Sequence, residues 1–208
     1  MKTKVNTKTL VLAGLLAALV VVVTNFNIPI GPLSISLTVI PVAIAAIALG
    51  PIGGAVMGAV FGICSFLQCF GILGTSGMGV FTLQISPVMT FLQRFVPRVL
   101  DGFCVGWIFR LVTKITNEKV SCFVTGFSTA LLNTIFFMSA LVIFFGNNSS
   151  FQETYMGSNG PLIYIISSIS VNAVLEMVAS TIIAGAVGFA LFKAKLITVP
   201  VKKITESV

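Results

Sequence analysis

The residues best suited to chemistry lie between two long apolar segments, in the stretch from Gln84 to Asp101. It brings together Gln84, Gln93, Arg94, Arg98 and Asp101 in a chain with few other charges inside its apolar segments. Arg94 and Arg98 are four residues apart, so on a helix they share a face, and Asp101 follows one turn after Arg98. Because charge is costly in lipid, two guanidiniums near a membrane boundary need a reason. One interpretation is a binding site for an anionic or polar solute. The other is a structural Arg98–Asp101 pair, with Arg94 reaching the lipid headgroups.

Three further polar residues, Asn133, Asn172 and Glu176, lie inside later apolar segments. Asn172 and Glu176 are four residues apart and share a helix face. A charged residue within a membrane helix costs about 2.5–3.5 kcal/mol on insertion scales, so these side chains should face the bundle interior. Glu176 is then a proton-relay carboxylate, a ligand contact or a countercharge for Arg98. The candidate substrate-binding residues are Gln84, Gln93, Arg94, Arg98, Asn133, Asn172 and Glu176.

The composition indicates an integral membrane protein, because 57% of the 208 residues are hydrophobic and only 8% are charged. One domain, 1–208, accounts for the length. Histidine is absent, which removes the usual general base and the commonest metal ligand. The four cysteines lack the spacing of a zinc site, so no metal or cofactor is expected. The chain also has no phosphate-binding GxxxxGK[ST] loop and no protease constellation, so we do not expect an enzyme.

The apolar segments predict an all-α membrane protein with six transmembrane helices in one bundle. The spans are expected at about 10–25, 36–50, 52–71, 91–113, 120–145 and 161–192. The second should end at Gly50-Pro51. Residues 71–87, rich in Gly, Ser and Thr, are expected to form a loop or a re-entrant segment.

Small residues give two of these helices smooth faces. Gly54, Gly58 and Gly62 recur every four residues in the third span, which allows another helix backbone to approach closely. This stripe is either a moving or partner-docking face or ordinary packing inside the bundle. Ala13 and Ala17 are also four apart in the first span and leave a shallow groove.

The net charge of +7 is a topology signal. Lysine and arginine concentrate before the first apolar run, in the gap at 110–119 and in the tail, whereas the loops at 25–37, 71–90 and 146–160 have none. With six spans, the positive-inside rule places both termini in the cytoplasm. No basic patch with interleaved aromatic residues is present, so nucleic acid is not an expected partner.

Several motifs resemble the S-components of energy-coupling factor (ECF) vitamin transporters, which are their substrate-binding membrane subunits. The general likeness rests on the Lys-rich start, the AxxxA first helix, Ile30–Ile35 leading to Ile40–Val42, and Ala48–Pro51 before the Gly-rich third helix. The segments most like the pantothenate-type members are Ser86-Pro87, Phe95–Gly102, Leu132–Thr134 and Asn172–Glu176.

The resemblance implies a six-helix protein of the bacterial plasma membrane that captures a vitamin with high affinity. It would then join a membrane scaffold subunit and two cytosolic ATPases. Pantothenate has a carboxylate, hydroxyls and an amide, which would suit Arg94 or Arg98 with Asn and Gln partners. The resemblance assigns the Ala13/Ala17 groove to the scaffold's coupling helices, and the alternative is packing against the third helix. The only tryptophan, Trp107, lies in the fourth span, and no aromatic cage for a flat vitamin is evident.

Two other function classes stay open. One is a stand-alone proton-coupled carrier or channel that uses Glu176. The other is a membrane enzyme or assembly factor, which the lack of histidine disfavours. Uptake by cells expressing the chain with and without ATPase and scaffold subunits would separate the importer from the carrier.

Overall fold

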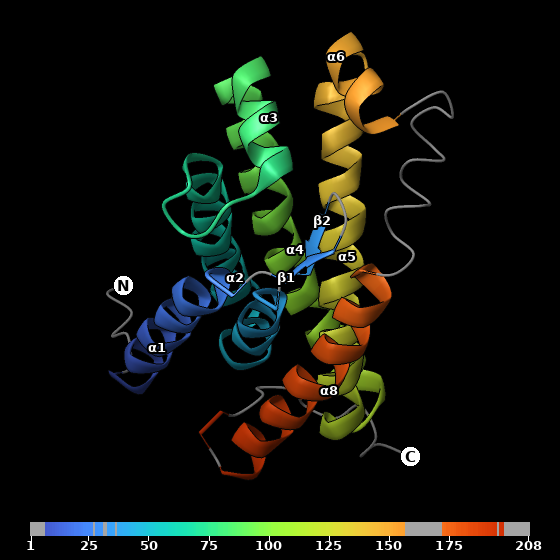
Figure 1. The fold of residues 1–208 in the computed structure, drawn as a ribbon. Coiled ribbons are helices and arrows are strands. Elements are labelled where there is room, and N and C mark those ends of the chain that lie inside the picture. The colour runs from blue at the N-terminus through green and yellow to red at the C-terminus, as the bar shows by residue number, and fades with distance from the viewer. Residues whose placement is uncertain are drawn as a thin grey trace, which may run out of the picture.

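The computed structural model describes residues 7–26, 28–30, 33–35, 37–156, 172–194 and 196–197. Its elements are α1 (Thr7–Thr24), β1 (Ile28–Ile30), β2 (Leu33–Ile35), α2 (Val39–Leu67), η1 (Gln68–Phe70), α3 (Gly77–Ile85), α4 (Pro87–Ile115), α5 (Glu118–Phe145), α6 (Ser149–Phe151), η2 (Gln152–Met156) and α8 (Asn172–Lys193). Apart from the antiparallel β1–β2 pair, in which Ile28 is opposite Ile35, the described elements are helical (Figure 1).

Four of the described helices are long and apolar enough to cross a membrane: Thr7–Thr24, Val39–Phe70, Glu118–Phe145 and Ala173–Lys193. The fourth expected span corresponds to α4, which is 29 residues long. It is not among the four, and it carries five charged residues: Arg94, Arg98, Asp101, Arg110 and Lys114. Thus the described helix with the most charged residues also holds more of the candidate binding residues than any other, namely Gln93, Arg94 and Arg98.

The helix α2 bends sharply at Gly50, where the sequence predicts the end of a span. Gly50 has φ 74° and ψ −165°, a conformation that L-residues with a side chain rarely adopt. Pro51 follows and has no backbone N–H to continue the helical ladder. The chain folds back so far that Ala46 Cβ lies 3.1 Å from the position a Cβ on Gly54 would take. The two arms, before and after Gly50, therefore pack against each other.

The glycine stripe of α2 packs internally, against α4. A Cβ on Gly54 would overlap the carbonyl oxygen of Gly102, and one on Gly58 would overlap the carbonyl oxygen of Arg98. A Cβ on Gly62 would lie 2.9 Å from Phe95 Cα. Of the two sequence interpretations, the structure supports packing inside the bundle. This close approach brings the arginines of α4 against the side chains of α2.

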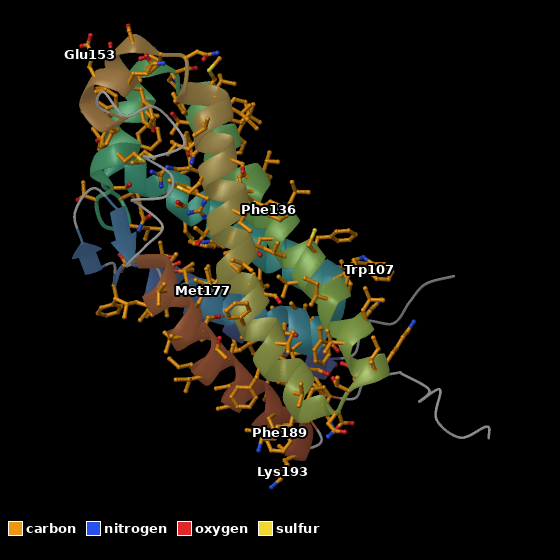
Figure 2. The ribbon with its side chains drawn as sticks, turned by 90° about the vertical axis from the view of Figure 1, so that its right-hand side faces the viewer. Trp107, Phe136, Glu153, Met177, Phe189 and Lys193 are labelled. Carbon is orange, nitrogen blue, oxygen red and sulfur yellow. The ribbon has the colours of Figure 1, made fainter. Side chains whose placement is uncertain are left out.

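The two ends of the molecule differ in charge. The end of α4, the start of α5 and the end of α8 lie at one end, where Lys114, Lys119 and Lys193 are found (Figure 1). At the opposite end lie α3, α6 and η2, and Figure 2 shows Glu153 there, far from Lys193.

The structure adds to or limits four expectations. The segment at 71–87, expected as a loop or a re-entrant segment, contains the nine-residue helix α3, and Ser76 caps its N-terminus by accepting a hydrogen bond from Gly79 N. The uncharged loop at 25–37 contains the β1–β2 pair, and the polar loop at 146–160 contains α6 and η2. Of the span expected at 161–192, the structure describes the part from Asn172, and 161–171 lie outside the described residues.

Candidate functional site

The candidate site is built on the buried face of α4. Gln93, Arg94, Arg98 and Asp101 follow helical spacing, and their side chains are 1%, 4%, 7% and 1% exposed, respectively. This face contacts α2 on one side and α5 on the other, because both helices pack along α4. The alternative in which Arg94 reaches the lipid headgroups does not fit this burial.

Arg98 lies between aromatic rings from two neighbouring helices. Its guanidinium carbon is 4.3 Å from the centroid of the Phe61 ring on α2 and 4.8 Å from that of Phe137 on α5. Such cation–π contacts contribute about 0.5–2 kcal/mol each, more when water is excluded. The rings hold the guanidinium in the interior without neutralising its charge.

The hydrogen bonds of Arg98 and Asp101 argue against a simple structural pair. Arg98 Nη1 donates to the backbone carbonyl of Arg94 at 3.2 Å, while Arg98 Nε has no partner. Asp101 Oδ1 is likewise buried without a hydrogen bond. The carboxylates of Glu176 and Asp101 both act electrostatically on the Arg98 charge.

Several buried polar atoms of the described residues have no hydrogen-bond partner. They are Gln93 Nε2, Arg94 Nε, Arg98 Nε, Asp101 Oδ1, Asn133 Oδ1 and Ser180 Oγ. An unsatisfied buried polar group costs about 1–3 kcal/mol, so several of them in one protein require compensation. The set offers both donors and acceptors, which matches a polar solute that itself has both.

Arg94 donates hydrogen bonds to the protein from both of its terminal nitrogens. Nη1 donates to Ser65 Oγ at 2.9 Å and to Ser65 O at 3.3 Å, and Nη2 donates to Ser76 Oγ at 3.0 Å. Ser65 lies on α2 and Ser76 is the N-cap of α3. Arg94 therefore links three elements.

The remaining predicted residues are more scattered. Asn133 on α5 and Glu176 on α8 are both buried at 7% exposure, whereas Gln84 is exposed on α3 and stands apart from the buried group. Asn172 begins α8, but its side chain lies outside the described residues. Among the described residues, no three His, Cys, Asp or Glu side chains gather to hold a metal ion.

The small-residue face of α1 is only partly covered. Ala13 and Ala17 are half-buried and pack at the edge of the main apolar core. Beside them, a Cβ on Gly14 would meet no atom within 4 Å.

Sequence reasoning missed the residues that hold the two arginines. Phe61 and Ser65 are four apart on α2, and Phe137 lies four residues after the predicted Asn133 on α5. That spacing puts each pair on one helix face and was the available signal. The partner helix for each face could not be read from the chain.

Comparison with known proteins gives one family and two relatives. The family model described as "ECF transporter, substrate-specific component" matches residues 8–188. The pantothenic acid transporter PanT of Lactococcus lactis subsp. cremoris (strain MG1363) is 28% identical over 197 residues, covering 89% of this chain and 93% of the relative. The pantothenate transporter PanT of Leuconostoc mesenteroides is 28% identical over 152 residues, covering 71% and 70%.

Proposed function

Because the chain belongs to the family of ECF transporter substrate-specific components, we propose that it is the pantothenate-binding subunit of an ATP-driven importer. Family membership makes it a vitamin-binding transport protein of the bacterial membrane and not an enzyme. Pantothenate is proposed as the ligand because both relatives are named as transporters of it.

The observation that carries the proposal is the guanidinium of Arg98, buried between Phe61 and Phe137 with no hydrogen-bond partner at Nε. A carboxylate is the natural partner of such a group, since it can accept two charge-assisted hydrogen bonds. We assign the pantothenate carboxylate to Arg98, because the terminal nitrogens of Arg94 already donate to serine oxygens.

The neutral part of pantothenate suits the other unpaired atoms. Its hydroxyls and amide N–H can donate to Asn133 Oδ1 and Asp101 Oδ1, and its amide carbonyl can accept from Gln93 Nε2. Glu176 and Asn172, one turn apart at the start of α8, are proposed as further contacts. In this assignment the ligand supplies hydrogen-bond partners to buried groups that are costly to leave unsatisfied.

The proposed topology has six spans, with the two arms of α2 counted separately and α4 included. Both termini lie in the cytoplasm, on the side of Lys114, Lys119 and Lys193, as the positive-inside rule requires. The end bearing α3, α6 and η2 then faces outward, and Arg94 and Arg98 belong to the outer half of α4.

Energy for uptake is proposed to come from a scaffold subunit and two cytosolic ATPases. The chain has no GxxxxGK[ST] loop, so any use of ATP requires other subunits. The face of α1 around Ala13 and Ala17 is the proposed docking surface for the scaffold, since close helix contact in lipid depends on small residues.

The proposal is tested by titrating detergent-purified protein with pantothenate in a calorimeter. Thiamin serves as the flat, cationic control. Tight binding of pantothenate with no binding of thiamin is the expected result. Small molecules that co-purify with the protein should be identified by mass spectrometry in the same preparation. Recovery of a different vitamin, with no pantothenate binding after its removal, would overturn the assignment.

A further inference from the structure

Arg94 holds the start of α3 through the oxygen that also caps that helix. Ser76 Oγ accepts one hydrogen bond from Gly79 N at 3.2 Å and a second from Arg94 Nη2 at 3.0 Å. The other terminal nitrogen of Arg94 is anchored on Ser65 of α2. The guanidinium therefore bridges the bundle and the α3 N-terminus.

The far side of α3 packs against α6 and η2. The Phe81 ring lies 5.3 Å from the Tyr155 ring and 6.4 Å from the Phe151 ring, centroid to centroid. Met78 and Phe151 are buried in the same apolar cluster, together with Phe145 at the end of α5. We call α3, α6 and η2 together the outer cap, which lies at the end of the molecule opposite Lys193 (Figures 1 and 2).

The segment before α3 can act as a hinge. Gly71 and Gly74 have φ values of 76° and 80°, so residues without a Cβ stand where the chain turns. Just before them, Gln68 Nε2 donates to Thr24 O at 2.9 Å, which ties the end of α2 to the end of α1. The base of the hinge is thus fixed. Beyond it, Ser86 joins the C-terminus of α3 to α4 and accepts hydrogen bonds from Met89 and Thr90, whereas Arg94 supplies the polar attachment at the α3 N-terminus.

Arg94 is also joined to the proposed ligand site. Its carbonyl oxygen accepts the hydrogen bond from Arg98 Nη1, one turn along the same helix. A guanidinium at the positive end of a helix is electrostatically opposed, so hydrogen bonding to Ser76 is weakened by the α3 dipole. The hydrogen bond attracts the guanidinium while the helix dipole repels it, so the Arg94–Ser76 contact can break and re-form readily.

We propose that Arg94 is a positioning residue, a latch that fastens the outer cap through Ser76 and sets the rate at which the Arg98 site opens. The ligand part of this inference rests on the proposed function, but the latch itself is a property of the unliganded protein. Arg94 then governs the kinetics of binding, whereas Arg98 governs the affinity.

Hydrogen exchange in the unliganded protein tests the latch without any ligand. Backbone amides of α3 (residues 77–85) should exchange about tenfold faster in Arg94→Lys and in Ser76→Ala than in the parent. A tenfold change corresponds to the free energy of about one lost hydrogen bond. Lysine keeps the positive charge, but its ammonium group cannot bridge Ser65 and Ser76 as the two terminal nitrogens of the guanidinium do. Arg110→Lys is the control, an exposed arginine towards the other end of the same helix, and should leave α3 exchange unchanged. Equal protection of α3 in all three variants and the parent would overturn the proposal.

Binding kinetics give the second readout, by stopped-flow fluorescence or surface plasmon resonance with pantothenate. Ser76→Asp retains a good N-cap and gives Arg94 a carboxylate partner, so it should slow both association and dissociation about tenfold. Ser76→Ala should speed both, with the dissociation constant nearly unchanged in each variant. Unchanged rates in both Ser76 variants would contradict the latch. If the parent binds no pantothenate, the proposed function fails while the exchange experiment still decides the latch.

Discussion

The guanidinium carbon of Arg98 on α4 lies 4.3 Å from the centroid of the Phe61 ring on α2. The contact fixes the orientation of a buried charge that has an unpaired Nε. If this orientation matters for the ligand, Phe61→Leu should weaken pantothenate binding about 3- to 10-fold, the scale of one cation–π contact. Titration calorimetry checks this. Phe66→Leu is the control, because Phe66 lies on the same helix and contacts Phe70 and Phe91 instead. Equal losses in the two variants would indicate a general packing effect.

The contact between Gly58 and the Arg98 carbonyl predicts a large effect of one methyl group. In Gly58→Ala the new Cβ would overlap the carbonyl oxygen of Arg98, so α2 and α4 must separate. We expect a loss of about 1–3 kcal/mol in the free energy of unfolding, as for other overpacked sites. Thermal unfolding in detergent should show a lower Tm. Gly14→Ala is the matched control, since its Cβ meets nothing within 4 Å, and its Tm should be equal or higher.

Glu176 distinguishes the proposed importer from a proton-coupled carrier. Its buried carboxylate acts on Arg98, which gives it a role that needs no proton gradient. Uptake of labelled pantothenate should therefore persist when the gradient is collapsed and ATP is maintained. Loss of uptake under those conditions, with full binding by the purified protein, would favour the carrier.

The small-residue face of α1 predicts separate effects on docking and on binding. In Ala13→Trp or Ala17→Trp, the bulky ring fills the proposed docking groove. We expect the isolated protein to fold and bind pantothenate, whereas complex formation with the scaffold and ATP-driven uptake fail. Co-purification with a tagged scaffold subunit measures the first of these losses. Because both alanines are half-buried at the core edge, loss of pantothenate binding in the isolated variants would show that the groove serves internal packing.

The sequence predicted those features of the fold that depend on residues close together in the chain. The bend at Gly50 follows from Gly-Pro chemistry, and the shared face of Arg94, Arg98 and Asp101 follows from helical spacing. The helix α3 was not predicted, since its nine residues include Gly77 and Gly79 and it depends on tertiary contacts. One of those contacts is the Arg94–Ser76 hydrogen bond.

The candidate site was only partly predictable for a related reason. Helical spacing placed the two arginines on one face but did not show which residues each of them contacts. Their difference arises from partners far along the chain: Ser65, 29 residues before Arg94, and Phe137 on α5. Such long-range pairings depend on which helices pack side by side, which periodicity within one helix does not encode.

The central claim, that Arg98 binds the pantothenate carboxylate, is tested most directly by a double-mutant cycle in which the ligand is also changed. Pantothenol replaces the carboxylate with a hydroxymethyl group and keeps the rest of the molecule. Calorimetry would measure both ligands against the parent and Arg98→Ala, with Arg110→Ala, an exposed arginine on the same helix, as control. Arg98→Ala should weaken pantothenate binding by about 1.5–3 kcal/mol and leave pantothenol binding nearly unchanged. Equal losses for both ligands, or no loss for pantothenate in folded protein, would contradict the account.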